Sequence, residues 1–493
     1  MFTIGYDIGS SSIKAALYDI DSGKEKGHST FPKNEMKIVS PYPGWAEQDP
    51  DIWWEAVVSA TKEVLANTKV NPSEIKAIGI SYQMHGLVLV DKNQHVLRSS
   101  IIWCDSRAVP IGNKAFEEIG KEKCLEYLLN SPGNFTASKL KWVIENEPEI
   151  FDKVYKFMLP GDFIAMKLSG EITTTTTGLS EGILWNFEDD IPAKFLMENY
   201  GFSESLLPEI VPVFGNQCNL SKAAANKIGL QQGIPITYRA GDQPNNAFSL
   251  NVLKPNEIAS TAGTSGVIYG VSEKIKFDPE GRVNTFVHVN HTNDSKRLGI
   301  LLCINGTGIS YNWIRKILYD SAISYEEINN LAEQTNIGSD GLTFLPFGNG
   351  AERMLHNREL GASFEGINFN IHGRKHMVRS VLEGVAFSFY YGINILNALA
   401  VNPKVIRAGM ANMFLSKTFR NTLATLSGAE IQLYNTDGAL GTARAAAYGA
   451  GFYNTFNEAF TNLECLTVVE PDVKNEDKYK AAYKKWDLEL QKK

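Results

Sequence analysis

The chain has 493 residues and a mass of 54.6 kDa, enough for roughly two to four domains. Apolar residues make up 43% and charged residues 21%, which excludes a disordered or fibrous protein. The net charge of −7, with Lys and Arg scattered, argues against nucleic acid as a partner. No apolar run is long enough to cross a membrane, and the five cysteines have no short spacing, so we expect a cytoplasmic protein with reduced thiols.

The N-terminal half begins with a strand pattern, because apolar residues alternate over residues 2–9. A Gly-Ser turn leads into a second predicted strand at Ser12–Ile20, and His28–Phe31 is a candidate third strand. A helix is predicted to follow, with Asp49 as its cap and Pro50 in its first turn.

The same order of elements returns later in the chain. Glu257–Thr261 is predicted as a strand, Ala262–Gly266 as a Gly-rich turn and Val267–Val271 as the next strand. Further elements follow: strands at Arg282–Val289 and Arg297–Ile304 and a helix at Ile309–Tyr319. The repetition predicts two similar α/β domains, and the loop near residues 246–256 suggests that they span residues 1–248 and 249–493.

Two other segments have an interpretable pattern. Thr173–Thr177 places five β-branched residues in a row, which predicts a strand. Near the C-terminus an apolar stripe recurs at helical spacing, which predicts an amphipathic helix docked on the core; its members are Tyr479, Ala482, Tyr483, Trp486 and Leu490.

Common nucleotide motifs are missing, since neither Gly-Lys pair precedes Ser or Thr and no G-x-G is completed as a dinucleotide fingerprint. Two Gly/Ser/Thr turns remain, at residues 7–12 and 262–266. Each alone is typical of a simple hairpin. Together, at equivalent places in both halves, their exposed N–H groups could bind one polyphosphate from two sides.

Three further clusters contain polar residues at predicted strand ends. Asp7 could orient Mg²⁺ through water, or could simply cap its turn. Asp242 follows an apolar strand, where it could accept a hydroxyl proton during phosphoryl transfer, although a Gly-Asp pair is often only a turn. The segment Ser81–Gly86 also follows a strand and offers Met84 and His85 to a ligand; a lone His is more often structural.

These clusters, taken with several longer motifs, resemble the FGGY family of carbohydrate kinases, and within it the bacterial xylulokinases. The resemblance runs over nearly the whole length and includes DIGSSSIK at 7–14, PGWAEQDPDIWW at 43–54, YQMHG at 82–86, WCDSR at 103–107, FTASKLKWVIEN at 135–146, LPGD at 159–162, TAGTSG at 261–266, GMAN at 409–412 and the stretch 362–383 ending in RSVLE.

The resemblance implies an actin/hexokinase-like ATPase fold, in which two ribonuclease-H-like domains flank a cleft. It implies ATP-dependent phosphorylation of a ketopentose, D-xylulose to D-xylulose 5-phosphate, with Asp242 as the base and Met84, His85, Asp242 and Gln243 at the sugar. ATP would meet residues of both halves, with Mg²⁺ near Asp7: Gly9, Ser10, Ser11, Lys14, Gly263, Thr264, Ser265, Gly308, Asn312, Gly409, Met410 and Asn412.

Two departures from the family pattern bear on the substrate and on the nucleotide. Gln243 stands where xylulokinases commonly have Asn, and Ala408-Gly409 replaces a Gly triplet at the adenosine loop. Alternatives are therefore a kinase for ribulose, fuculose or a seven-carbon ketose, or a non-catalytic actin-like nucleotide-binding protein. A homodimer is a possible assembly, and no sequence feature identifies an interface.

Overall fold

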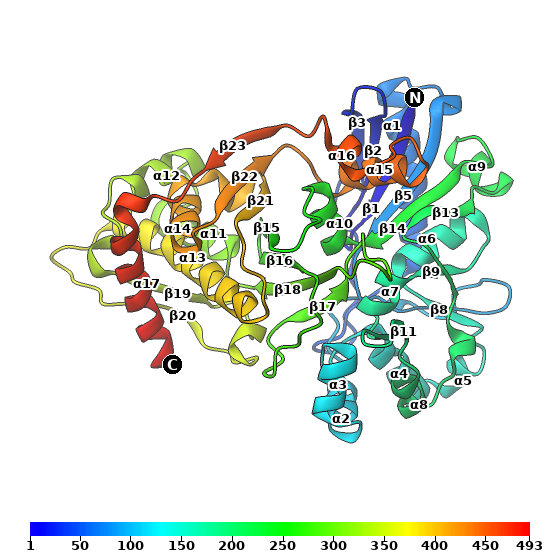
Figure 1. Ribbon diagram of the computed structural model, residues 1–493, viewed down its shortest axis with the longest axis horizontal. Coiled ribbons are helices and arrows are strands. Elements are labelled where there is room, and N and C mark those ends of the chain that lie inside the picture. The colour runs from blue at the N-terminus through cyan, green and yellow to red at the C-terminus, as the bar shows by residue number, and fades with distance from the viewer.

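The N-terminal half is built on one twisted sheet of six strands. The computed structural model describes all residues, 1–493, and shows two sheet-centred lobes side by side (Figure 1). Three neighbouring strands of the N-terminal sheet, β14, β5 and β1, are parallel, so their carboxyl ends share one edge. The strand order is β13 (Phe214–Asn219), β14 (Pro235–Gly241), β5 (Ile75–Tyr82), β1 (Phe2–Ile8), β2 (Ile13–Asp19) and β3 (Lys24–Phe31).

The C-terminal half repeats this arrangement with one added strand. Its order is β17 (Asn284–Val287), β18 (Leu298–Ile304), β16 (Gly266–Ser272), β15 (Glu257–Ala262), β21 (Val405–Gly409), β22 (Glu430–Tyr434) and β23 (Cys465–Val469). The run β3-β2-β1-β5-β14 matches β18-β16-β15-β21-β22 in both order and direction. The duplication expected from the sequence is therefore present, with β17 as an addition to the second copy.

Helix α15 (Gly438–Gly449) comes from the C-terminal half but packs on the N-terminal sheet. In Figure 1 it lies, coloured orange, over the blue strands. The approach is close because a side chain at Gly5 would lie 2.3 Å from the Ala439 carbonyl oxygen. Thr3 Oγ1 on β1 also donates a 2.6 Å hydrogen bond to the Ala443 carbonyl. The two halves therefore share a packed helix, and the division into residues 1–248 and 249–493 stays a prediction.

The remaining helices cover the sheets or form a helical region beside the N-terminal sheet. The cap predicted for the first helix is confirmed, because the Asp49 side chain accepts from the Asp51 N–H at the start of α1. The main helices are α1 (Pro50–Thr68), α2 (Val109–Glu118), α3 (Lys121–Leu128), α4 (Thr136–Asn146), α6 (Pro160–Ser169), α7 (Thr176–Glu181), α8 (Lys194–Tyr200), α9 (Lys222–Ile228), α10 (Asp242–Ser249), α11 (Gly308–Tyr319), α12 (Tyr325–Glu333), α13 (Arg374–Ala398), α14 (Lys417–Ser427), α16 (Phe456–Phe460) and α17 (Glu476–Gln491). None of the helices is both long and apolar enough to cross a membrane.

The two other sequence interpretations have different outcomes. The C-terminal helix is confirmed as α17, which docks with Trp486 fully buried and donating to the Phe344 carbonyl at 2.9 Å. The five-residue threonine strand is wrong in its second half: the strand β9 (Thr173–Thr175) ends after three residues. Thr175 then caps α7 by accepting from the Gly178 N–H, and local capping outweighs β-propensity there.

The two lobes meet at an apolar cluster beside the carboxyl ends of the N-terminal strands. Met84 of the N-terminal half packs in this cluster with Phe286 and Leu301 of the C-terminal sheet. The added strand β17 is also held by polar contacts, since Asn130 exchanges two 2.8 Å hydrogen bonds with the backbone of Thr285. One face of the C-terminal sheet therefore lies against the region where the sugar was predicted to bind.

Candidate active site

Three neighbouring strand ends bring the N-terminal clusters together. Tyr82 at the end of β5 is paired with Ile8 on one side and Gly241 on the other, so Gly9, Gln83 and Asp242 follow on adjacent strands. They line one cavity of about 300 Å³, here called the N-terminal cavity. Its lining residues are Asp7, Gly9, Ser10, Ser11, Ser12, Lys14, Gln83, Trp103 and Asp242. Most of the N-terminal predictions thus converge on one space.

The N-terminal cavity concentrates negative charge. Burial and the nearby Asp7 carboxylate raise the pKa of Asp242 to about 7, while hydrogen bonds from Gln243 act in the opposite direction. The pKa of Asp7 is also raised, mainly by burial and also by Asp437, with Lys14 partly offsetting the shift. Like charges that cannot separate raise one another's pKa, and a bound cation would relieve this repulsion.

Asp437 is a site residue that the sequence analysis missed. Its side chain caps α15 by accepting from the Leu440 N–H, and the next residue, Gly438, lies so close to Asp7 that a Cβ there would be 2.8 Å from Asp7 Oδ2. Asp437 follows β22, which is the counterpart of β14, so it corresponds in the second half to Asp242 in the first. A comparison of the two repeated halves, strand by strand, is the sequence signal that identifies Asp437.

The acidic cluster fits a hydrated magnesium ion better than a bare one. No trio of His, Cys, Asp or Glu is arranged to hold a metal ion directly. Mg²⁺ keeps several waters and is commonly bound through one or two carboxylates plus substrate phosphates. Asp7 and its acidic neighbours therefore suit an ion that arrives with a nucleotide.

Met84 lies next to the residue that precedes Asp242, and His85 follows Met84 in the chain; neither is among the residues that line the N-terminal cavity. Met84 packs against the Gly241 backbone, where a Cβ would be 2.7 Å from Met84 Cγ. His85 has a left-handed backbone (φ +62°), and its Nδ1 lies 2.8 Å from the Glu181 carbonyl. Because a carbonyl only accepts, Nδ1 carries the proton, and burial keeps the ring neutral by lowering its pKa to about 3. The other ring nitrogen, Nε2, is then free to accept a hydrogen bond.

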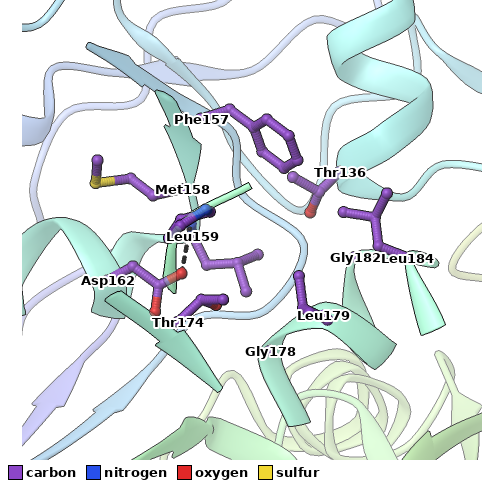
Figure 2. Close-up of a pocket in the computed structure, with 11 residues that line it drawn as sticks. Thr136, Phe157, Met158, Leu159, Asp162, Thr174, Gly178, Leu179, Gly182 and Leu184 are labelled. Carbon is purple, nitrogen blue, oxygen red and sulfur yellow. Dashed lines mark hydrogen bonds between the residues drawn. The ribbon is translucent and has the colours of Figure 1, made fainter. Parts of the chain in front are cut away.

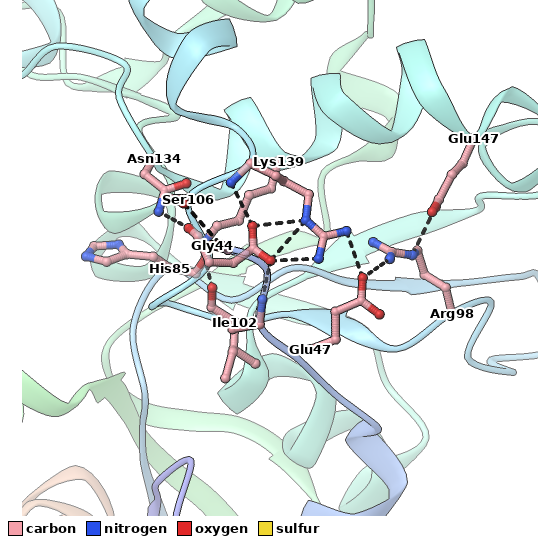
Figure 3. A network of polar contacts seen from close by, with 12 residues as sticks. Gly44, Glu47, His85, Arg98, Ile102, Ser106, Asn134, Lys139 and Glu147 are labelled. Carbon is pink, nitrogen blue, oxygen red and sulfur yellow. Dashed lines mark hydrogen bonds and ion pairs between the residues drawn. The ribbon is translucent and has the colours of Figure 1, made fainter. Parts of the chain in front are cut away.

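A polar network fixes the position of His85 (Figure 3). The fully buried Lys139 donates from Nζ to the carbonyls of His85 (2.8 Å) and Ile102 (3.0 Å). Next to it, Arg107 pairs with Asp105 at 2.6 Å and with Glu47 at 2.7 Å. Glu47, Arg107 and Lys139 belong to the motifs at 43–54, 103–107 and 135–146, to which the sequence alone assigned no role. The structure shows that they buttress the predicted sugar site.

Five of the eight predicted nucleotide residues of the C-terminal half meet in a second cavity of about 530 Å³, here called the C-terminal cavity. The Gly308 N–H donates to the Gly263 carbonyl at 2.8 Å, and a Cβ on Gly308 would lie 2.4 Å from that oxygen. Only glycine permits this close approach of the turn and helix α11. The lining residues are Ala262, Gly263, Thr264, Gly308, Ile309, Tyr311, Asn312, Tyr325, Asn329, Asn412, Met413, Leu415 and Ser416.

Several residues of the C-terminal cavity were not predicted. Tyr325 of α12 donates to the Asn312 side chain at 3.2 Å, and Leu415 is half exposed at the rim. Both lie outside the short motifs, and only the fold brings them to the cavity. Three predicted residues, Ser265, Gly409 and Met410, are not among the lining residues.

A small cavity lies next to the ion pair that holds strand β14. Figure 2 shows it between β8 (Lys156–Met158), α6 and α7, with Asp162 at one side. Its volume of about 10 Å³ leaves space for one water molecule at most. Asp162 forms a buried ion pair with Arg239 of β14 at 3.1 Å. Arg239 stands three residues before Asp242, so the pair fixes the strand that carries it.

Two sheets of matching order, each with a cavity in its half of the chain, belong to the class of proteins with the actin/hexokinase-like ATPase fold. The family model for the N-terminal domain of the FGGY family of carbohydrate kinases matches residues 2–249. The chain therefore belongs to the FGGY family of carbohydrate kinases, and it is a sugar kinase.

Relatives with nearly the same length support this assignment. A xylulose kinase of Staphylococcus epidermidis is 29% identical over 97% of this chain and 94% of its own length. One from Escherichia coli is 28% identical, covering 90% and 88% of the two chains. The crystal structure of a xylulose kinase from Rhodospirillum rubrum matches the fold with a TM-score of 0.90, at 24% identity over 100% of this chain and 99% of the other.

Proposed function

We propose that this kinase transfers the γ-phosphoryl group of ATP to a ketopentose, D-xylulose, giving D-xylulose 5-phosphate. The observation that carries the proposal is the convergence of Asp242, Met84 and the first phosphate turn at three adjacent strand ends. The similar proteins support the same sugar, because those of Staphylococcus epidermidis, Bacillus subtilis and Escherichia coli are xylulose kinases.

Asp242 is the proposed general base. A carboxylate with its pKa near 7 is ionised in part at neutral pH and is a stronger base than an ordinary aspartate. It takes the proton of the attacking hydroxyl as the bond to the phosphoryl group forms, and it orients that oxygen for in-line attack. The neutral His85 ring accepts a hydrogen bond from another sugar hydroxyl, and Met84 packs against the C–H face of the sugar.

The nucleotide is proposed to bind in both cavities. The phosphates contact the backbone N–H groups of the turn at Gly9–Ser11, with Lys14 beside them, and those of the turn at Gly263–Ser265. The nucleoside lies in the C-terminal cavity, where Gly308, Asn312 and Asn412 line the wall. Gly409 and Met410, which do not line it, precede Asn412 in the predicted adenosine loop. Magnesium neutralises phosphate charge when bound, and Asp7 would hold its water shell.

The fold alone does not choose the sugar. Crystal structures of a gluconate kinase from Lactobacillus acidophilus and of a glycerol kinase from Plasmodium falciparum with ADP match it with TM-scores of 0.89 and 0.87, at 23% and 20% identity. Glycerol kinases resemble this chain at Asp242-Gln243 but carry an Arg-Glu pair in place of Met84-His85, so a ketose is favoured.

A ketose panel tests the substrate. We expect sugar-dependent ADP release in a coupled assay to be fastest with D-xylulose, compared with ribulose, fuculose, sedoheptulose, gluconate and glycerol. Phosphorus NMR of the product should show a 5-phosphate ester. A faster rate with any other sugar contradicts xylulose, and nucleotide binding without ADP release from any sugar favours the non-catalytic alternative.

A further inference from the structure

A short helix that packs against strand β18 of the C-terminal sheet carries an arginine without an acidic partner. Arg353 begins the short helix η4 (Arg353–Leu355), and its Nε donates to the Gly281 carbonyl at 2.9 Å. Neither Nη group donates to a protein atom, and Arg353 forms no ion pair, because the nearby Asp278 is already bound bidentately by Arg282. A partly buried guanidinium is thus oriented by one bond, and both of its Nη groups are left without a protein acceptor.

Arg353 lies near the predicted sugar residues rather than at the outer surface. Gly281, its anchor, stands three residues before β17, and Phe286 on that strand packs against the His85 ring at 5.5 Å. Cys303 on β18 lies on the same sheet face as Leu301, two residues away, which packs with Met84 and Phe286. Desolvation, Glu352 and Asp242 raise the pKa of the Cys303 thiol to about 11, and the Arg353 charge opposes this shift. The Arg353 charge also lowers the pKa of His85.

The local structure holds Arg353 in place. The preceding residue, Glu352, is fully buried, and its Oε1 accepts from the Asn305 N–H at 2.9 Å, which ties η4 to the end of β18. Burial lowers the pKa of Arg353 to about 10, so the guanidinium is still charged at neutral pH although it is poorly solvated. A half-buried cation whose two Nη groups have no protein acceptor favours an oxygen-rich ligand.

We propose that Arg353 hydrogen-bonds two vicinal oxygens of the acceptor ketose, the carbonyl oxygen and a neighbouring hydroxyl, from the C-terminal domain. This rests on the proposed function and adds a residue that determines specificity. The planar fork of a guanidinium matches two neighbouring acceptors, whereas a lysine ammonium does not. The ketose would then bridge the two domains, with its reactive hydroxyl at Asp242 and its carbonyl end at Arg353.

The test compares Arg353→Met with a matched control in the same segment. Arg358 is exposed and donates only to the Leu355 carbonyl, so Arg358→Met removes the same side chain outside the site. We expect Arg353→Met to raise KM for D-xylulose roughly 10- to 100-fold, as expected for lost charged hydrogen bonds, with KM for ATP unchanged. Arg353→Lys should recover only part of this loss, and Arg358→Met should match the wild type.

Two results would overturn the inference. An unchanged KM for D-xylulose in Arg353→Met excludes sugar contact, and a parallel rise in KM for ATP assigns the residue to the nucleotide instead. Calorimetric titration of D-xylulose in the presence of the non-hydrolysable analogue AMP-PNP distinguishes a failure of the Arg353 contact from a failure of the proposed function. Binding lost in Arg353→Met but present in the wild type supports the contact even without turnover, and a wild type that binds no ketose contradicts both proposals. Thermal unfolding checks that each variant folds.

Discussion

At the scale of single residues, the charge of the site is set by carboxylates that the fold holds close together. Asp7 and Asp437 lie at the ends of two elements that α15 packing brings together, and Asp242 stands beside Asp7. The sequence predicts Asp7 and Asp242, because each lies at the end of an apolar strand within two residues of a glycine. It does not predict the shifted pKa values, since these depend on burial and on charges from distant parts of the chain.

The raised pKa of Asp242 predicts a pH dependence. A base acts only when deprotonated, so protonation below its folded-state pKa of about 7 removes activity. We expect kcat/KM, which reports ionisations of the free enzyme, to fall as pH decreases through about 7, approaching a tenfold loss per pH unit. The measurement is a coupled assay over about pH 5.5 to 9 with inert buffers. A profile that stays flat down to about pH 5.5 contradicts a base with this pKa.

At the scale of elements, the close packing of α15 on the N-terminal sheet joins the two halves. The helix sequence is rich in alanine and glycine, and the strands below it carry Gly5 and Gly79 where it crosses. The sequence pattern suggests a buried helix, yet nothing in it indicates that the helix belongs to the other half's sheet. Small residues on both sides allow backbones to approach, and only the folded chain shows which surfaces meet.

This packing predicts the effect of adding one methyl group. In Gly5→Ala the new Cβ would lie 2.3 Å from both the Ala439 carbonyl oxygen and the Ala443 nitrogen, so the helix must shift. We expect a loss of about 1–3 kcal/mol in the free energy of unfolding, measured by urea titration. Gly373→Ala is the matched control, because its Cβ meets nothing within 4 Å and its φ of −122° suits alanine. Equal stability of the two variants contradicts the packing.

Element boundaries show where local signals compete. The strand–turn–strand pattern at residues 2–20 predicts β1 and β2 well, because alternation and a Gly-Ser turn agree. The threonine run fails after Thr175, where a side-chain hydroxyl caps α7 instead of extending β9. The third strand is longer than predicted, Lys24–Phe31 rather than His28–Phe31, since exposed charged residues conceal its first half.

At the scale of the whole molecule, most of the predicted nucleotide residues line two cavities, one in each half of the chain. The sequence predicts both turns and their equivalence, and the matching strand orders confirm the duplication. The relative placement of the halves follows from α15 and from the contact of Phe286 with His85, and neither is encoded in a local motif.

Because the predicted binding residues lie in both halves of the chain, we expect the two domains to close when substrates bind. Sugar and nucleotide bound to both halves should favour a more compact state, which excludes water from the phosphoryl group. We expect the radius of gyration from small-angle X-ray scattering to decrease when D-xylulose and AMP-PNP are both present, and to change less with either alone. Unchanged scattering with both ligands at saturating concentration contradicts closure.

The central claim is that the carboxylate at the end of β14 performs the proton transfer, and the turnover number of Asp242→Asn tests it most directly. We expect kcat with D-xylulose to fall by about 10²–10⁴-fold. Asp294→Asn, an identical change in an exposed loop between β17 and β18, should leave kcat unaltered. Because ionisation of Asp242 costs stability above its raised pKa, the Asn variant should unfold at the wild-type temperature or higher at about pH 8. Turnover of Asp242→Asn within a few-fold of wild type would contradict the account.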